Sequence, residues 1–179
     1  MGAISNRVFQ NAIQYPEKLA IIEHGGKALT YSQLLKEVEK FVNFLNKEID
    51  PAISRVAICM HEGINIPTLV LSLNALMVPI IPINPGLQSE QINTLIKSVD
   101  ANVIIFDSST SYLSKEIKND VHVIDISIAC KALITKKTEL HDSSNFESYN
   151  EFLITLSSGS TGKPKPIVYS EKNKIDRSK

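Results

Sequence analysis

Short, almost uninterrupted apolar runs recur along the chain and limit the folds that it can adopt. Two of them, residues 55–60 and 102–106, have the length of a strand and lack the polar alternation of a strand with one solvent-exposed face. Helical spacing of apolar residues lies between them, at residues 66–77 and 89–99. This alternation predicts an α/β fold with a parallel or mixed sheet flanked by helices.

Apolar spacing and turn residues predict further elements on both sides of this unit. They are a helix at 5–15 with Ser5 or Asn6 as N-cap, a hairpin of strands 19–22 and 28–30, a helix opening at 30–34, strands at 80–83, 121–126, 152–156 and 167–169, a weaker helix at 111–118, and the start of a helix at 170–179. Residues 127–150 are more polar, and we expect 142–145 to form a surface loop.

Residues 66–83 are apolar almost throughout, which raises the question of a membrane span. We reject that interpretation because Asn74 lies within the run and Pro79 and Pro82 interrupt it. The chain has 179 residues, of which 43% are hydrophobic, as expected for one globular domain. Its 19 basic and 19 acidic residues balance, which argues against nucleic acid or a polybasic membrane patch as a partner.

The cysteines and histidines do not indicate a metal site. Cys59 and Cys130 lie in apolar contexts, and no secretory leader precedes them, so we expect reduced core thiols in a cytoplasmic protein. The four histidines have no metal-ligand spacing, which argues against a structural metal. His61 ends a predicted strand, and we interpret it as a structural residue.

A glycine- and hydroxyl-rich stretch, LSSGSTGKPKP at residues 156–166, lies between the last two predicted strands. Glycine lets backbone N–H groups turn toward a polyphosphate, and hydroxyl and lysine side chains add further donors. The stretch therefore predicts a phosphate-binding loop, although a flexible linker has a similar composition. The candidate ligand-binding residues are Ser157, Ser158, Gly159, Ser160, Thr161, Gly162 and Lys165.

Spacing excludes the two best-known phosphate loops. A Walker loop needs G-x-x-x-x-G-K-[ST] running directly into a helix, whereas Gly159 and Gly162 are three positions apart and Pro164 follows Lys163. The pattern G-x-G-x-x-G is also absent.

The stretch resembles the signature loop of the adenylate-forming enzymes, which include acyl-CoA synthetases, nonribosomal peptide adenylation domains and luciferases. The family pattern is [YF]-[TS]-S-G-[ST]-T-G-x-P-K-G. Eight positions fit it, and a chance run of that length is improbable: Ser157, Ser158, Gly159, Ser160, Thr161, Gly162, Pro164 and Lys165. Leu156 replaces the usual aromatic residue, and Pro166 replaces the final glycine.

Two further segments are similar to family motifs. Residues 29–34 resemble a Leu-Thr-Tyr-x-x-Leu element, which alone is weak evidence. Residues 73–85 resemble a helix-to-strand passage ending in Pro-[IL]-[ND]-Pro. Met77 stands where the family usually has glycine, so we expect the helix and the strand to meet less closely here.

The resemblance implies that residues 1–179 are an incomplete N-terminal AMP-binding domain, without the small C-terminal domain. In the family reaction, a carboxylate attacks the α-phosphate of MgATP, and the acyl group then passes to a thiol of CoA or a carrier protein. The resemblance places the β- and γ-phosphates against residues 158–162, with Lys165 steadying the loop or the pyrophosphate. Lys163 occupies a variable, solvent-facing position.

The family's magnesium-binding glutamate and its catalytic lysine lie downstream of the loop, so the resemblance assigns no catalytic residue here. We therefore expect the fragment to bind ATP, with Mg²⁺ carried by the nucleotide, and to be inactive alone. Two alternatives stay open: a free-standing nucleotide- or phosphate-binding module, and a non-catalytic interaction protein with a vestigial loop.

Overall fold

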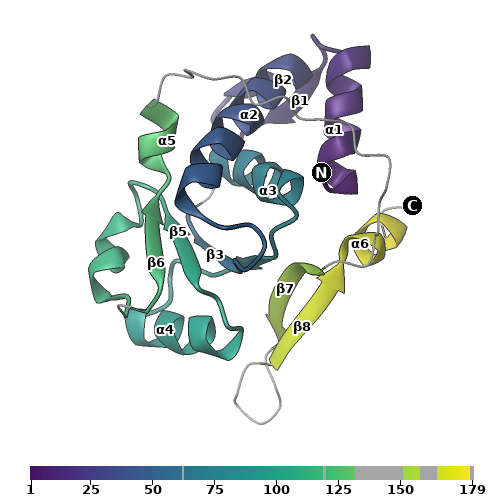
Figure 1. Cartoon of the computed structure of the whole chain (residues 1–179). Coiled ribbons are helices and arrows are strands. Elements are labelled where there is room, and N and C mark those ends of the chain that lie inside the picture. Colours follow the sequence, from purple (N-terminus) through teal and green to yellow (C-terminus); the bar gives the residue numbers. More distant parts are fainter. Residues whose placement is uncertain (62, 119, 132–150, 158–164, 178–179) are drawn as a thin grey trace.

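The structure is a computed structural model that describes residues 1–61, 63–118, 120–131, 151–157 and 165–177. Figure 1 shows helices and strands alternating along the chain, with the two ends of the chain on the same side of the molecule. The elements are α1 (Ala3–Gln14), β1 (Leu19–Ile22), β2 (Ala28–Thr30), α2 (Tyr31–Glu48), β3 (Val56–Cys59), α3 (Asn65–Ala75), β4 (Ile80–Pro82), α4 (Ser89–Ser98), β5 (Val103–Phe106), the 3₁₀ helix η1 (Ser111–Glu116), β6 (His122–Asp125), α5 (Ser127–Lys131), β7 (Glu151–Ser157), β8 (Lys165–Ser170) and α6 (Glu171–Arg177).

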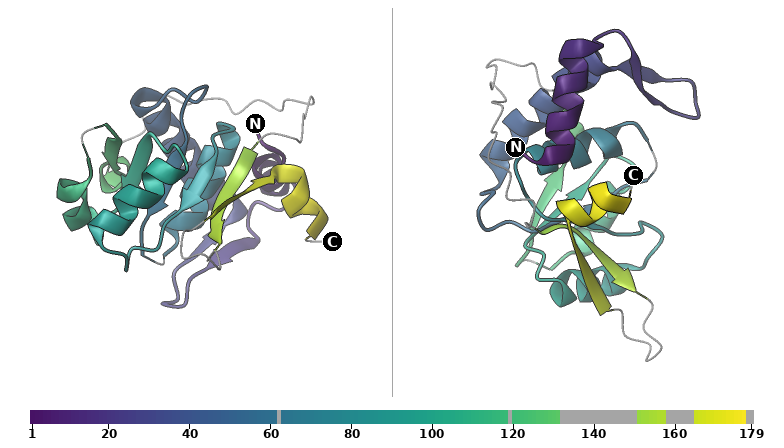
Figure 2. Two further views of the ribbon diagram at one scale, coloured as in Figure 1. Left: turned by 90° about the horizontal axis from the view of Figure 1, so that it is seen from below. Right: turned by 90° about the vertical axis from the view of Figure 1, so that its right-hand side faces the viewer.

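A mixed sheet of six strands forms the centre of the molecule, in the order β6-β5-β3-β4-β7-β8. The first five strands in this order run parallel, and β8 pairs antiparallel with β7. Helices cover both faces of the sheet (Figure 2). The predicted α/β fold with a mixed sheet is therefore confirmed.

The central strands β3 and β5 are buried on both faces, as their unbroken apolar sequences predict. Alternate residues of each strand point to opposite faces and enter two separate cores. One core joins the sheet to α2 and α3 and includes Val56, Ile58, Val103 and Ile105. The other joins it to α4 and η1 and includes Ala57, Cys59, Ile104 and Phe106.

The antiparallel hairpin β1-β2 leads directly into α2. Thr30 is the N-cap of α2, where its hydroxyl accepts from the Gln33 N–H and the Gln33 side chain accepts from the Thr30 N–H. This capping box satisfies two donors that a helix start leaves unpaired. It explains why the helix opens where the sequence predicted.

Two helices end in Schellman turns that lack glycine. After α3, the Val78 N–H donates to the Leu73 carbonyl at 3.0 Å, and Met77 adopts φ 59°. After α4, the Ala101 N–H donates to the Ile96 carbonyl at 3.0 Å, and Asp100 adopts φ 52°. Glycine is usual at this left-handed position because it has no Cβ. The turn between α3 and β4 is therefore complete, even though its left-handed position is occupied by Met77 and not by glycine.

Several expectations need correction. The predicted N-caps Ser5 and Asn6 lie inside α1, because that helix starts at Ala3 with Gly2 as its N-cap. The weaker helix at 111–118 is a 3₁₀ helix, and the polar stretch after residue 126 begins with the unpredicted helix α5. The predicted surface loop at 142–145 lies outside the described residues.

The other predicted elements are confirmed to within a few residues, including the two strands that flank the glycine-rich stretch and the helix after Ser170. Among the described helices, none combines the length and the apolar character needed to cross a membrane.

Candidate functional site

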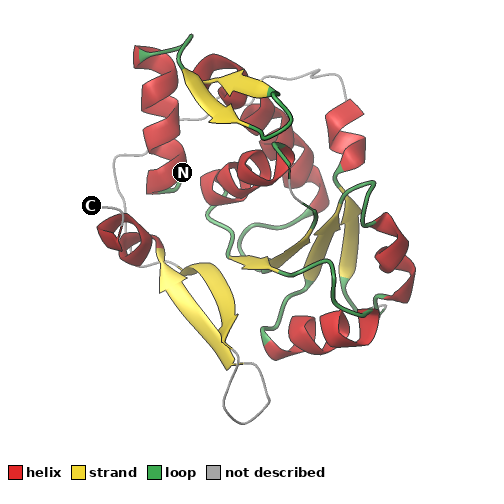
Figure 3. Ribbon diagram, turned by 180° about the vertical axis from the view of Figure 1, so that it is seen from behind, coloured by secondary structure: helices red, strands yellow, loops and turns green. Residues whose placement is uncertain are grey.

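The end of β7 and the start of β8, which flank the predicted phosphate-binding loop, lie at the carboxyl edge of the parallel strands. Because β7 runs parallel to β4, its last residue, Ser157, lies at the same edge as the ends of β3, β4 and β5. Ligands of open α/β sheets bind at this edge. The β7-β8 hairpin stands beside the rest of the sheet in Figure 3.

Ser157 and Lys165 stand at the two ends of the loop. They are partners in the antiparallel register of β7 and β8, and the Ser157 hydroxyl donates to the Lys165 carbonyl at 3.2 Å. The structure thus brings together two of the seven predicted site residues. The predictions for Ser158, Gly159, Ser160, Thr161 and Gly162 lie outside the described residues, as does that for Lys163.

Within the described residues, β7 joins β4 at one register pair, Leu153 opposite Ile80. At the start of β7, Glu151 forms an ion pair with Arg55 at 2.8 Å, and the Arg55 guanidinium also donates to the Val99 carbonyl at 3.3 Å. The half of the hairpin that bears the loop extends beyond these contacts.

A cavity of about 660 Å³ lies against the half of the hairpin that bears the loop. This volume is within the range of small-molecule sites, roughly 300–1,000 Å³. Its walls come from the end of β4, from α4 and from β7, and they consist of Pro82, Ile83, Asn84, Leu87, Glu90, Gln91, Thr94, Leu95, Thr155, Leu156 and Ser157. The predicted residue Ser157 thus borders the cavity as well as the loop.

Sequence reasoning missed the polar part of this wall. Asn84 directly follows a predicted strand, and a polar residue at that position could have indicated a site at the carboxyl edge of the sheet. Glu90, Gln91 and Thr94 lie on α4, where they look like ordinary solvent-facing residues of an amphipathic helix. Only the placement of α4 across the cavity from β7 makes them part of its wall.

Asp107 organises the same edge of the sheet after β5. Its carboxylate accepts hydrogen bonds from the backbone N–H groups and hydroxyls of Ser109 and Thr110. Burial opposes the charged form, but these bonds outweigh it and lower the pKa of the Asp107 carboxyl. The Thr110 hydroxyl also lies 2.8 Å from the Cys59 carbonyl, so its one proton is shared between this carbonyl and the Asp107 carboxylate, and β3 is held next to the turn after β5.

Cys59 is a free, fully buried thiol, as predicted. Burial, together with the negative charge of Asp107, raises the pKa of this thiol to about 11. A thiol that is hardly ionised near neutral pH is a poor nucleophile, so Cys59 is a packing residue. The prediction for the Cys130 side chain lies outside the described residues.

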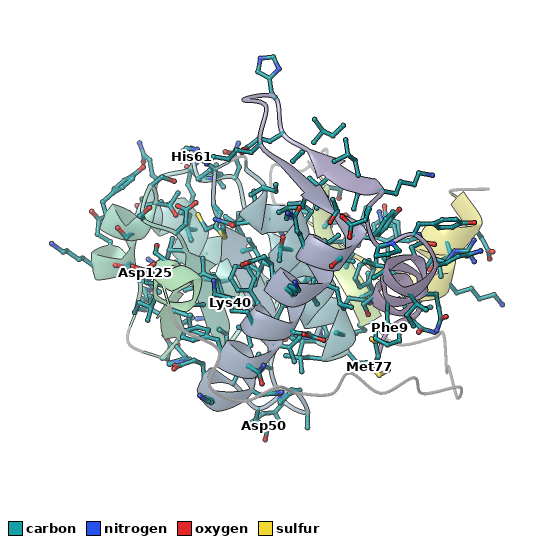
Figure 4. All side chains as sticks on the ribbon, turned by 90° about the horizontal axis from the view of Figure 1, so that it is seen from above. Phe9, Lys40, Asp50, His61, Met77 and Asp125 are labelled. Carbon is teal, nitrogen blue, oxygen red and sulfur yellow. The ribbon has the colours of Figure 1, made fainter. Side chains whose placement is uncertain are left out.

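His61 follows β3 at the same edge and is exposed, with its side chain at the rim of the molecule in Figure 4. Within the part of the chain that the structure describes, no three histidine, cysteine, aspartate or glutamate side chains gather as metal ligands would.

Comparison with known proteins places these features in a family. The sequence model described as AMP-binding enzyme matches residues 8–177. The hybrid PKS-NRPS synthetase pynA of Aspergillus niger is 24% identical over 179 residues, covering 95% of this chain and 4% of that protein. The nonribosomal peptide synthetase atnA of Emericella nidulans is 25% identical over 166 residues, covering 90% of this chain and 2% of that protein.

Solved structures share the fold. The N-terminal domain of FACL13 from Mycobacterium tuberculosis superimposes with a TM-score of 0.82 at 19% identity, covering 96% of this chain and 45% of that one. The AMP complex of O-succinylbenzoate coenzyme A synthetase (MenE) from Bacillus subtilis gives a TM-score of 0.80 at 20% identity, covering 96% and 43%. The chain thus spans less than half of these structures and a few per cent of the curated relatives that it matches.

Proposed function

Because the chain belongs to the family of AMP-binding enzymes, we propose that it forms the phosphate-binding part of an enzyme that activates a carboxylic acid with ATP. In this reaction a carboxylate oxygen attacks the α-phosphate of MgATP, the bond to the β-phosphate breaks, and acyl-AMP and pyrophosphate result. The acyl group then passes to a thiol. The same substrates favour a cytoplasmic location, which is part of the proposal.

The loop between β7 and β8 is the phosphate site in this proposal. Backbone N–H groups and hydroxyls of residues 158–162 hold the β- and γ-phosphates, and Lys165 neutralises charge on the loop side of the leaving pyrophosphate. Positioning and charge neutralisation provide most of the catalysis in such a reaction. Lys163 has no phosphate-binding role in this proposal.

One observation carries the proposal: the motif joins two paired strands at the carboxyl edge of a parallel sheet, beside a cavity of small-molecule size. A solvated linker needs neither the Ser157–Lys165 register nor a cavity next to it. Both features suit a loop that receives one end of an elongated ligand.

We propose that the acyl acceptor is the thiol of CoA or of a carrier protein. Relatives named as nonribosomal peptide synthetases, and an artificially fused adenylation-PCP di-domain among the structural neighbours, support a carrier protein. Acyl-CoA synthetases among the neighbours support CoA. Magnesium enters with ATP and lowers the charge on the phosphates when bound.

Isothermal titration of the 179-residue protein with MgATP and with pyrophosphate tests the proposal. We expect binding that weakens about tenfold in Thr161→Ala and in Lys165→Ala, because each removes a donor to a charged phosphate. Lys163→Ala is the matched control, since it removes the same charge two residues away, and its affinity should stay within twofold of wild type.

Turnover separates the full reaction from binding alone. We expect no exchange of pyrophosphate into ATP by these 179 residues, because the family's catalytic lysine and magnesium-binding glutamate are not among the matched motifs. No binding at millimolar ligand, or equal losses in Lys163→Ala and Lys165→Ala, would count against the loop as a phosphate site.

A further inference from the structure

The first turn of α1 is capped by a residue from the other end of the chain. This helix has no side-chain hydrogen bond at its N-cap, Gly2, and no acidic residue in its first turn. Instead, Glu171 at the start of α6 accepts a hydrogen bond from the Ile4 N–H on its Oε1 atom at 2.6 Å. A carboxylate at this position satisfies an unpaired donor and interacts favourably with the helix dipole.

Asn74 connects this carboxylate to α3. Its Nδ2 atom donates to the same Glu171 Oε1 at 3.0 Å, and its Oδ1 atom accepts from the Ser5 N–H at 2.8 Å. Its backbone carbonyl accepts from the Gly2 N–H at 3.1 Å. The two side chains and the start of α1 form what we call the Asn74–Glu171 junction. Asn74 and Glu171 are 3% and 8% exposed, so solvent contributes little to these contacts.

The junction has little tolerance for change. A Cβ on Gly2 would overlap the side-chain amide of Asn74, so any larger residue there would displace that amide. Loss of the Glu171 carboxylate would leave the Ile4 N–H and the Asn74 amide without this acceptor in a buried place. Such unsatisfied groups are costly, so an acceptor oxygen at position 171 stabilises the contact between the three elements.

The junction lies at one end of the β7-β8 hairpin, and the predicted loop lies at the other. Figure 1 shows α6 beside the N-terminal end of α1, with the hairpin running away from it. Strand β8 has six residues and is therefore roughly 20 Å long. A tilt of about 10° at Glu171 would move the far end by roughly 3 Å, far more than a hydrogen bond tolerates.

Core packing restrains the inner strand β7, because Phe152 and Ile154 are buried in the two cores and Leu156 packs against the second. The pairing with β4 at Leu153 and the Arg55–Glu151 ion pair also lie toward the base of the hairpin. The outer strand presents Ile167 and Val168 to solvent, 40% and 48% exposed. The position of the outer strand β8 therefore depends on its pairing with β7 and on how its base is held at Glu171.

We propose that the Asn74–Glu171 junction sets the direction of β8, the outer strand of the β7-β8 hairpin, which makes Glu171 and Asn74 positioning residues for the phosphate-binding loop. The inference rests on the proposed function for its effect on ligand binding. Its structural part concerns the hairpin alone and can be measured without a ligand.

Hydrogen exchange and MgATP titration of the 179-residue protein test the proposal with Glu171→Ala and Glu171→Gln. In Glu171→Ala we expect the amides of β7 and β8 to exchange at least tenfold faster, those of β3 and β5 to keep their rates, and MgATP to bind at least fivefold more weakly. Glu171→Gln should stay within twofold of wild type in both measurements, because its amide oxygen can accept both hydrogen bonds.

Ile117→Val is the matched control. It lowers stability by removing a buried methyl group on the far side of the sheet, and we expect neither local exchange in the hairpin nor MgATP affinity to change. If Glu171→Ala does not fold, Glu171→Asp retracts the carboxylate by one methylene and should accelerate hairpin exchange at least threefold.

The proposal would be overturned if the amides of β7 and β8 in Glu171→Ala exchanged at wild-type rates. It would also be overturned if the amides of β3 and β5 were accelerated equally, because that result indicates only a loss of global stability. Failure of Glu171→Gln to restore the hairpin would also overturn it. If wild type binds neither MgATP nor pyrophosphate, the proposed function fails, while the exchange rates still decide the role of the junction.

Discussion

Met77 offers a test of how the turn between α3 and β4 is built. It occupies the left-handed position of a Schellman turn with φ 59°, and it is 43% exposed at the rim of the molecule (Figure 4). Replacement by glycine should relieve a clash between Cβ and the backbone. We expect Met77→Gly to be more stable than Met77→Ala, although glycine is normally the weaker residue near a helix.

The magnitude follows from two opposing contributions. An L-residue in the left-handed region costs roughly 1–2 kcal/mol, which alanine retains and glycine removes. Glycine loses more backbone freedom on folding, at a cost of about 0.5–1 kcal/mol relative to alanine. Both variants lose the same methionine contacts, so these cancel in the comparison. The difference should be about 0.5–1 kcal/mol in favour of glycine, or about 1–4 °C in Tm for a chain of this size.

Urea unfolding followed by circular dichroism measures the difference. Ala75→Gly is the control, because Ala75 is the last helical residue of α3, where glycine should instead cost up to about 1 kcal/mol. Asp100→Gly and Asp100→Ala repeat the comparison at the second turn, with the same sign expected. If Met77→Ala is as stable as Met77→Gly, the left-handed conformation is not a source of strain and the reasoning is wrong.

Three further predictions concern single interactions. Thr30→Ala should lower the free energy of unfolding by about 1 kcal/mol, and Thr30→Ser should restore it, because the hydroxyl closes the capping box of α2. The folded-state pKa of Asp107 is lowered, so its stabilisation is present above its unfolded pKa of 3.8 and is lost as the pH falls below that value. Asp107→Asn should therefore flatten the acid limb of a stability-versus-pH curve; an unchanged limb would contradict the assignment. The pKa of Cys59 is raised in the folded state, so its effect on stability has the opposite pH dependence. The contribution of the neutral thiol to the free energy of unfolding is complete below pH 9 and should be lost as the pH rises toward about 11. In a Cys130→Ser background, Cys59 should react with a disulfide reagent at pH 8 only after denaturant is added, and rapid reaction in buffer would refute its burial.

The sequence was sufficient to predict the fold where local pattern and burial agree. The strands β3 and β5 could be predicted because a strand covered on both faces must be apolar along its whole length. The start of α2 could be predicted because the capping box lies within four residues of chain. In both cases the determining contacts are local or are implied by composition.

Prediction failed where the deciding contact joins distant parts of the chain. Ser5 and Asn6 are good N-cap residues, yet α1 starts before them. Glu171 accepts from the Ile4 N–H and the Asn74 side chain accepts from the Ser5 N–H, so the first turn is satisfied without either residue as a cap. A separation of 167 residues leaves no periodicity or motif to reveal the bond between Glu171 and Ile4. Asn74 argued correctly against a membrane span, but its partners could not be inferred from the sequence.

The candidate site, like the fold, could be predicted only in part from the sequence. The glycine-rich motif identifies the loop from sequence, because glycine, hydroxyl and lysine at fixed spacing reflect phosphate chemistry. The cavity next to it depends on the packing of α4 beside β7, which no local pattern encodes. The structure therefore shows two features that the sequence does not: the cavity lining contributed by α4, and the contacts that hold the hairpin at Glu171.

The strained turn at Met77 and the Asn74–Glu171 junction share one group, the backbone carbonyl of Asn74. It accepts from the Met77 N–H at 3.0 Å and from the Gly2 N–H at 3.1 Å, so the left-handed turn and the start of α1 meet at one atom. Glycine at 77 can keep the same φ without strain, so Met77→Gly should be more stable than Met77→Ala and leave hairpin exchange and MgATP affinity at wild-type values. A loss of affinity in that variant would mean that the methionine side chain itself supports the junction. The turn at Asp100 lies outside the junction, so Asp100→Gly reports the conformational effect alone.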